Sequence, residues 1–184
     1  MKKILVVEDS KLISQTLKNM IENKLNFECL VARTKEECEQ LLLIHKNCFE
    51  VALLDLGLPD APDGEIIDVV EKTNIPIIVL TGSSNKEHIF REKNIVDYVI
   101  KDGAYSILYA LNITKQLVKN REIKVLVADD SRVCLKKTFD LLKRYNLQVF
   151  TASDGIEALK VFEKNPDIKI LFTDYNMPNM DGIE

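Results

Sequence analysis

The chain has 184 residues, of which 46% are hydrophobic and 29% are charged, and its formal net charge is −4. This length predicts one domain or slightly more than one, with enough apolar residues for a core. The mild acidity and the lack of a basic run argue against nucleic-acid binding, and no segment approaches the roughly 18 unbroken apolar residues of a membrane span.

The N-terminal stretch "MKKILVVEDS" has two lysines and an apolar run, as signal peptides do. The run is short, ends in two acids and is followed by no small-residue cleavage site, which argues against export. The four cysteines form no CxxC pair. We therefore expect a reduced, cytoplasmic chain.

In chain order, short apolar runs alternate with amphipathic stretches as far as residue 121. Continuous apolar runs are typical of strands that are buried on both faces of a parallel sheet, and five occur, at 4–7, 28–32, 51–54, 77–80 and 98–100. The stretches that follow them predict helices with one apolar face. The first carries Leu12, Ile13, Thr16, Leu17, Met20 and Ile21, and the others lie near 38–45, 66–70, 85–94 and 104–120. This order predicts an α/β fold, a doubly wound (βα)5 sheet with right-handed crossovers.

The chain then repeats part of itself. "KKILVVEDSKLISQTLKNMI" at 2–21 aligns with "IKVLVADDSRVCLKKTFDLL" at 123–142, and Asp55 aligns with Asp174. We predict a complete domain at 1–121 and a second at 122–184 that contains only the N-terminal half, βαβαβ. No linker rich in Gly, Ser or Pro separates them, so the connection should be short. The predicted elements of the second copy are strands at 124–128, 148–152 and 169–173 and helices at 132–145 and 155–165.

Acidic residues end the first and third strands of both copies. In the first copy they are Glu8, Asp9 and Asp55, and in the second they are Asp129, Asp130 and Asp174. In open α/β sheets, ligands bind at the carboxyl ends of the strands. Three carboxylates gathered there repel one another, and a hard divalent cation such as Mg²⁺ relieves the repulsion. One such acid could be a helix cap or a turn residue, but the repetition of the set favours a metal site.

Two further polar residues end strands of the first copy. Thr81 follows the fourth strand in "VLTGSS", beside Gly82, and Lys101 follows the fifth in "DYVIKDG". Taken singly, they could be a helix cap and a solvated surface lysine. A hydroxyl and an ammonium that face a metal ion are, together, what the oxygens of a phosphoryl group require.

With these motifs the chain resembles bacterial two-component response regulators that carry tandem receiver domains. The resemblance rests on "LVVEDS", "LLDLGLPDAPDG", "LTGSS" and "DYVIKDG" in the first copy, and on "LVADDS" and "FTDYNMPNMDG" in the second. It implies a flavodoxin-like sheet with strand order 2-1-3-4-5. It also implies a phosphorelay role in which a sensor histidine kinase or a phosphotransfer protein phosphorylates Asp55.

The resemblance implies further roles for individual residues. Mg²⁺ would be held by Glu8, Asp9, Asp55 and the backbone carbonyl of Gly57. Thr81 and Lys101 would bind the phosphoryl oxygens, and Thr81 and Tyr98 would act in the conformational switch. In the second copy, Asp174 would be a second phosphoacceptor, and the metal ligands would be Asp129, Asp130, Asp174 and Asn176.

The chain departs from the family in two places. Asp102 stands where relatives usually have a proline after the lysine, which affects the geometry of that loop. The second copy has no counterpart of Thr81 or Lys101, so we expect it to bind metal but to be phosphorylated poorly. We interpret the chain as a fragment cut before an output domain. Two surfaces are candidates for homodimer contacts: the helix 4–strand 5–helix 5 face and the unpaired edge of the strand at 169–173.

The sequence leaves two alternatives to a stand-alone signalling module. The chain could be the regulatory part of a larger enzyme, such as a diguanylate cyclase, although receiver domains catalyse only their own phosphorylation and dephosphorylation. It could also be a flavodoxin-like binder of nucleotide or flavin. Against that reading, the loop after the first strand is the acidic "EDSK", where a phosphate cradle would be rich in Gly or Ser.

Overall fold

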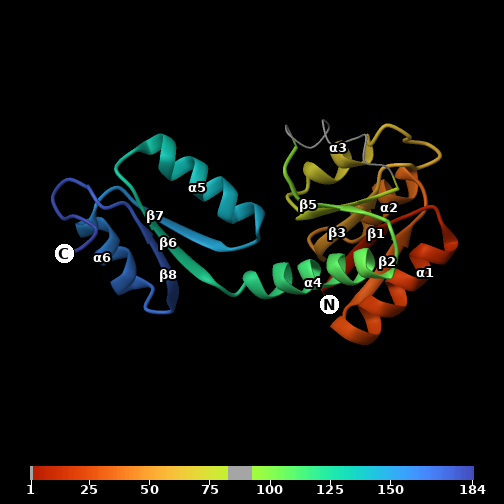
Figure 1. The fold of residues 1–184 in the computed structure, drawn as a ribbon, viewed down its shortest axis with the longest axis horizontal. Coiled ribbons are helices and arrows are strands. Elements are labelled where there is room, and N and C mark those ends of the chain that lie inside the picture. Colours follow the sequence, from red (N-terminus) through yellow and green to blue (C-terminus); the bar gives the residue numbers. More distant parts are fainter. Residues whose placement is uncertain (1, 83–92) are drawn as a thin grey trace. The chain divides into compact units, whose positions relative to one another are not determined.

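The computed structural model describes residues 2–82 and 93–184, and the chain divides into two compact units, Met1–Val118 and Lys119–Glu184 (Figure 1). Strands and helices alternate in both units, as the apolar runs predict, apart from the stretch between β4 and β5, most of which lies outside the described residues. The elements of the first unit are β1 (Lys3–Val7), α1 (Lys11–Met20), the π-helical turn η1 (Ile21–Leu25), β2 (Glu28–Ala32), α2 (Lys35–Ile44), β3 (Phe49–Asp55), α3 (Ile66–Glu71), β4 (Ile77–Thr81), β5 (Ile95–Ile100) and α4 (Ala104–Asn120), whose last two residues belong to the second unit.

The second unit repeats the beginning of this order. It contains β6 (Lys124–Ala128), α5 (Arg132–Arg144), β7 (Gln148–Ala152), α6 (Gly155–Lys164) and β8 (Ile168–Thr173). Only residues 121–123 separate α4 from β6, which confirms the short connection expected between the copies.

Both sheets are parallel in all their described pairings. The five strands of the first unit run in the order β2-β1-β3-β4-β5, which confirms the predicted order, and the three of the second run β7-β6-β8. β1 lies between β2 and β3, and its Leu5 is paired with Leu30 of β2 and Ala52 of β3. The carboxyl ends of β1, β3, β4 and β5 therefore meet at one edge of the first sheet.

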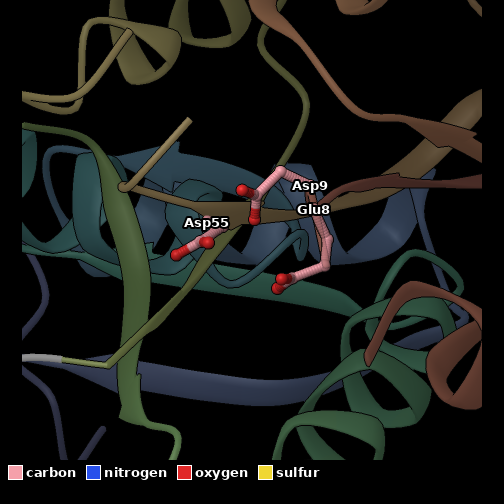
Figure 2. A group of neighbouring side chains, drawn as sticks. All are labelled: Glu8, Asp9 and Asp55. Atoms are coloured by element: carbon pink, nitrogen blue, oxygen red, sulfur yellow. The ribbon is translucent and has the colours of Figure 1, made fainter. Parts of the chain in front are cut away.

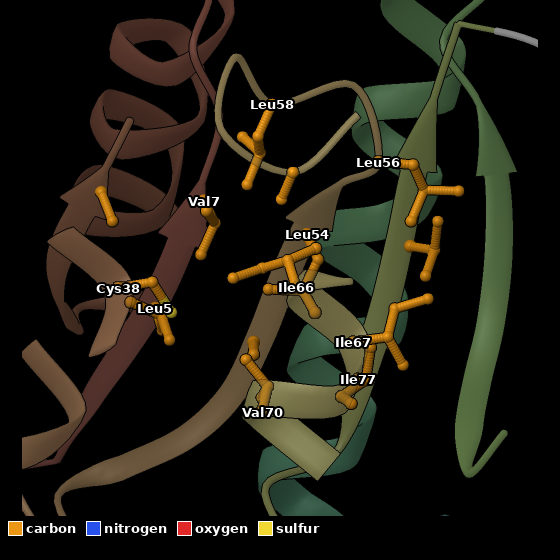
Figure 3. Close-up of a cluster of buried hydrophobic side chains, with 14 of the residues drawn as sticks. Leu5, Val7, Cys38, Leu54, Leu56, Leu58, Ile66, Ile67, Val70 and Ile77 are labelled. Atoms are coloured by element: carbon orange, nitrogen blue, oxygen red, sulfur yellow. The ribbon is translucent and has the colours of Figure 1, made fainter. Parts of the chain in front are cut away.

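Apolar residues on the strands of the first unit are buried on both faces. Leu5 and Val7 of β1 pack on one face with residues of α2 and α3 such as Cys38 and Ile66 (Figure 3). The alternate residues of the strand, Ile4 and Val6, pack on the other face against α1 and α4. This arrangement explains why the strands read as continuous apolar runs.

The second unit has a smaller core, formed by Leu126, Ala128, Ala152 and Ile168. In β8 only Ile168 is buried, and the remaining five residues are exposed. Within the part of the chain that the structure describes, β8 pairs with β6 alone, so its other edge carries no strand partner. The expected unpaired edge is thus present in the second unit.

The structure differs from the sequence-based prediction in several local features. β3 begins at Phe49 and β5 at Ile95, both earlier than predicted. Leu12, which the sequence pattern predicts on the apolar face of α1, is 78% exposed, whereas Ser14 is buried and donates its hydroxyl to the Ser10 carbonyl at 2.8 Å. The turn η1 has no counterpart in the prediction. The helix predicted near 85–94 falls almost entirely on residues outside those that the structure describes.

Asparagine residues mark the ends of several helices. Asn26, Asn47, Asn74 and Asn146 follow η1, α2, α3 and α5, and all have φ between 58° and 65°. Asparagine adopts this left-handed conformation more readily than other non-glycine residues, and a left-handed residue after the last helical turn is a common helix stop. Within residues 2–82 and 93–184, no helix is long and apolar enough to cross a membrane.

We expect the four free cysteines to differ sharply in reactivity. Burial raises the pKa of both Cys29 and Cys38 to about 12, so about one in 10⁴ of these thiols is ionised at pH 8, and only the thiolate reacts. Cys134 is exposed. Mass spectrometry after brief iodoacetamide treatment at pH 8 should therefore find Cys134 modified and Cys29 and Cys38 intact. In urea all four should react, and equal labelling of Cys134 and Cys29 in the folded chain would contradict the burial.

Candidate functional site

Three acidic side chains of the first unit meet at the carboxyl ends of β1 and β3. Glu8 and Asp9 follow β1, and Asp55 is the last residue of β3. Each offers a carboxylate oxygen within 4.8 Å of those of the other two. Figure 2 shows the three side chains gathered around one point at this edge of the sheet. The predicted set of acids is therefore brought together.

The turn from β1 into α1 sets the positions of Glu8 and Asp9. The N–H of Glu8 donates to the Ala32 carbonyl at 2.9 Å, which extends the β1–β2 ladder by one residue and leaves the Glu8 side chain 1% exposed. Ser10 then caps α1 by accepting from the N–H of Ile13. Because the strand ends and the helix begins within three residues, Asp9 is left exposed at the sheet edge.

Lys101 contacts two of the three acids. Its ammonium lies 2.7 Å from Oε2 of Glu8 and 3.0 Å from Oδ2 of Asp55. Its own N–H donates to the Thr81 carbonyl at 2.7 Å, which joins the end of β5 to the end of β4. The sequence placed Lys101 at this edge, and the structure shows it in direct contact with the acids.

Burial raises the pKa of Glu8 above its usual range. The hydrogen bond from Lys101 acts in the opposite direction, and the nearby charge of Asp55 raises the pKa further. The ionised form of Glu8 is thus held in a place where desolvation and a second carboxylate disfavour it. Additional positive charge at this cluster would favour the ionised form of the Glu8 carboxyl.

A cleft of about 350 Å³ joins the predicted residues into one site. Its lining includes Glu8, Asp9, Asp55, Gly57, Thr81 and Lys101. Tyr98 is not among the lining residues: it is partly buried against the core cluster of Figure 3. In the loop after β5, Asp102 follows Lys101. There Asp102 donates its N–H to the Ile100 carbonyl at 3.0 Å, a hydrogen bond that proline could not make.

The second unit repeats the cluster in a more exposed form. Asp129, Asp130 and Asp174 also lie within 4.8 Å of one another through carboxylate oxygens. Asp174 directs one oxygen to the next backbone N–H at 2.8 Å, as Asp55 does in the first unit. Asp130 and Asp174 are exposed, as is Asn176. The strands that would carry counterparts of Thr81 and Lys101 are not among the three that residues 119–184 form.

A 2-1-3-4-5 parallel sheet with strand-end acids, a threonine and a lysine at one edge defines a receiver-type α/β domain. The chain belongs to the response regulator receiver domain family, whose model matches residues 4–111 and 125–184, one match in each unit. Receivers of this family belong to two-component phosphorelay systems, and both matches contain strand-end acids of the clusters described above.

Individual relatives agree with this assignment. The chain is 41% identical over 68 residues to the sensor histidine kinase RcsC of Escherichia coli K12. This match covers 37% of this chain and 7% of that protein. It is 43% identical over 65 residues to a chemotaxis protein CheY homolog of Campylobacter jejuni, which covers 34% of this chain and 48% of that protein. The chain thus spans less than half the length of either relative.

Solved structures match over the whole chain. A crystal structure of a two-component system response regulator/GGDEF domain protein has a TM-score of 0.85 and 38% identity, covering 100% of this chain and 74% of that one. A second structure with a similar description has a TM-score of 0.83 and 36% identity. Both units of this chain, with their connection, are therefore within the matched region.

Proposed function

We propose that Asp55 accepts a phosphoryl group from the phosphohistidine of a sensor histidine kinase or a phosphotransfer protein. The observation that carries this proposal is the contact of Lys101 with both Glu8 and Asp55 inside the cleft. A carboxylate nucleophile with a neighbouring cation and two further acids is suited to phosphoryl transfer, in which catalysis is mainly positioning and charge stabilisation.

The donor set of the cluster fits Mg²⁺. All three side chains supply oxygen, which Mg²⁺ prefers, and the cleft leaves room for the water ligands that this ion retains. Glu8, Asp9, Asp55 and the backbone carbonyl of Gly57 would hold the ion. Bound Mg²⁺ would supply positive charge to the oxygens of the transferring group.

The chain's own residues have distinct roles in the proposed transfer. An oxygen of Asp55 forms a bond to phosphorus while the bond from phosphorus to the donor imidazole nitrogen breaks, and the electron pair leaves with that nitrogen. Lys101 and the Thr81 hydroxyl bind the phosphoryl oxygens. The product adds about 1.5 to 2 negative charges, and we propose that Thr81 and Tyr98 respond to them in the switch.

The same roles extend in part to the second unit, which we propose begins at residue 122. The division of the chain between Val118 and Lys119 supports a boundary in this region. Asp174 would be a second phosphoacceptor, and Asp129, Asp130, Asp174 and Asn176 would hold Mg²⁺. Asp130 and Asp174 are exposed, so we expect a weaker site than that of the first unit.

The surroundings of the protein are also part of the proposal. We place it in the cytoplasm, where its four free thiols would stay reduced. We keep two surfaces as candidates for homodimer contacts. One is the face formed by β5 and α4, on which Tyr105 is 88% exposed; α4 corresponds to helix 5 of the predicted fold. The other is the free edge of β8.

A test of the proposed function is covalent phosphorylation by a small donor. The purified chain is incubated with acetyl phosphate and Mg²⁺, and intact mass is followed for the addition of one phosphoryl group. Borohydride reduction converts an aspartyl phosphate into homoserine, which peptide mass spectrometry locates. We expect modification at Asp55 that disappears when EDTA removes the metal. No added mass with Mg²⁺ present, or modification elsewhere only, would contradict the proposal.

A second candidate function is regulation of an enzyme domain. Two structural neighbours that match the whole chain are described as response regulator/GGDEF domain proteins. This observation favours a role in which the two units control a diguanylate cyclase. The reading frame after residue 184 tests it: a GGDEF-type sequence would support this role, and a helix-turn-helix sequence would indicate a transcription factor instead.

A further inference from the structure

The loop that follows Asp55 is attached to the N-terminus of α2. Its attachment point is Asp60, whose Oδ1 accepts the N–H of Lys35 at 2.8 Å and whose Oδ2 accepts the N–H of Glu36 at 3.1 Å. The first N–H groups of a helix have no partner within it, and an anion is stabilised beside them. These two hydrogen bonds lower the pKa of Asp60, which keeps its carboxylate ionised.

The second unit makes the same junction with different atoms. Asn179 lies five residues after Asp174, as Asp60 lies five after Asp55, and its Nδ2 donates to Oδ2 of Asp154, the N-cap of α6, at 2.8 Å. The N–H of Gly155 donates to the Met180 carbonyl at 3.1 Å. A Cβ on Gly155 would lie 2.6 Å from the Met180 side chain, so this contact is close. The junction recurs with different groups, one bond donated by the loop and one by the helix, which indicates that the junction itself matters rather than one particular hydrogen bond.

The junction encloses a short segment that belongs to the site. Between Asp55 and Asp60, Leu56 and Leu58 are 1% exposed and pack in the core cluster of Figure 3, while Gly57 between them faces the cleft. The N–H of Ala61 donates to the Leu58 carbonyl at 3.2 Å, which closes the turn. Gly57 has no side chain to hold its backbone, so its place beside Asp55 depends on the anchors on either side.

We propose that Asp60 is a positioning residue for the site: its contact with α2 holds the backbone of Gly57 at the cleft beside Asp55. The inference rests on the proposed cation site and gives a role to a residue that has none in the proposed function. Groups that orient metal ligands typically change metal affinity about 10- to 100-fold when they are removed. A junction that only capped α2 would contribute to stability and leave cation binding unchanged.

The chain offers a matched control on the same helix end. Thr34 caps α2 from within, its hydroxyl accepting the N–H of Glu37 at 3.1 Å, and it does not contact the loop through that bond. Thr34→Ala and Asp60→Ala each remove a cap from the N-terminus of α2. Only Asp60→Ala releases the loop.

The test compares these two variants in an Asp174→Asn background, which disables the second cluster. Mn²⁺ binding is measured by electron paramagnetic resonance of the free ion, and Mg²⁺ binding by competition. We expect Asp60→Ala to raise the Kd of both ions about tenfold and Thr34→Ala to change it less than twofold. Exchange of the Ala61 amide hydrogen should be faster in Asp60→Ala only, because that amide closes the released turn.

The outcomes separate a positioning role of Asp60 from a purely stabilising one. An unchanged Kd in Asp60→Ala, or an equal rise in Thr34→Ala, would overturn the positioning role. Asp60→Asn retains one acceptor oxygen, so its Kd for the cation should lie between those of the parent and Asp60→Ala. Failure of the parent itself to bind either ion would overturn the proposed cation site instead, and Ala61 exchange would then show independently whether Asp60 holds the loop.

Discussion

Replacing Asp55 with asparagine is expected to lower phosphorylation of the chain by acetyl phosphate by roughly 10³-fold or more. The amide has the shape of the carboxylate but lacks the charged oxygen that attacks phosphorus, and loss of a nucleophile has effects of this size or greater. The measurement is the rate of phosphoryl incorporation, followed by intact mass, with Mg²⁺ in excess. Folding should be retained, because asparagine keeps the acceptor oxygen that receives the Leu56 N–H.

Asp174→Asn is the matched control, because Asp174 holds the corresponding place at the end of β8 and receives the next N–H in the same way. We expect it to leave most of the label in place, since the first unit contains Thr81 and Lys101 and the second has no counterpart of either. Label that survived Asp55→Asn and vanished with Asp174→Asn would reverse the assignment of the working acceptor.

Replacing Lys101 with methionine should slow phosphorylation about 10²- to 10³-fold, the usual cost of removing one preorganised group that stabilises transition-state charge. Methionine retains much of the apolar length of lysine but not the ammonium that lies 3.0 Å from Asp55. The measurement is again the initial rate of labelling by acetyl phosphate. Lys115→Met, which removes an exposed lysine on α4, should leave the rate unchanged.

Cation binding distinguishes lost charge stabilisation from a collapsed site in this variant. In the parent, Glu8 and Asp55 share the Lys101 ammonium. Without it, a divalent cation becomes the main neutralising charge for these acids, so the Kd for Mg²⁺ should stay equal or fall. Slow labelling together with lost cation binding would mean that Lys101 maintains the structure of the site, and the proposed role in phosphoryl transfer would be wrong.

The cluster could be predicted from sequence because of one property of parallel sheets. Each acid directly follows an apolar run, and the carboxyl ends of parallel strands meet at a common edge. The sequence therefore predicts that Glu8, Asp55 and Lys101 lie together, although they are up to 93 residues apart. The internal repeat added a second copy of the pattern, which made a chance arrangement of acids less plausible.

Contacts between a loop and a distant helix end could not be predicted in the same way. Asp60 lies in a turn motif, and its bonds to Lys35 and Glu36 cross 25 and 24 residues without any periodicity to reveal them. Hydropathy does not predict the burial of Ser14, because it does not register that the hydroxyl is satisfied by the Ser10 carbonyl. Both features depend on partners for single polar groups, and composition carries no information about these.

The left-handed asparagines have a consequence for how such a chain could arise. Asn26 and Asn146 hold the same place in the two units, two residues before the second strand: Asn26 follows η1, and Asn146 lies just after α5, with φ of 58° and 65°. The residue that stops the helix lies just after it, and the stop does not depend on contacts with the sheet. A gene segment that encodes one unit therefore includes its own helix stop signals when it is copied. Two copies can then be joined in sequence through a connection as short as residues 121–123.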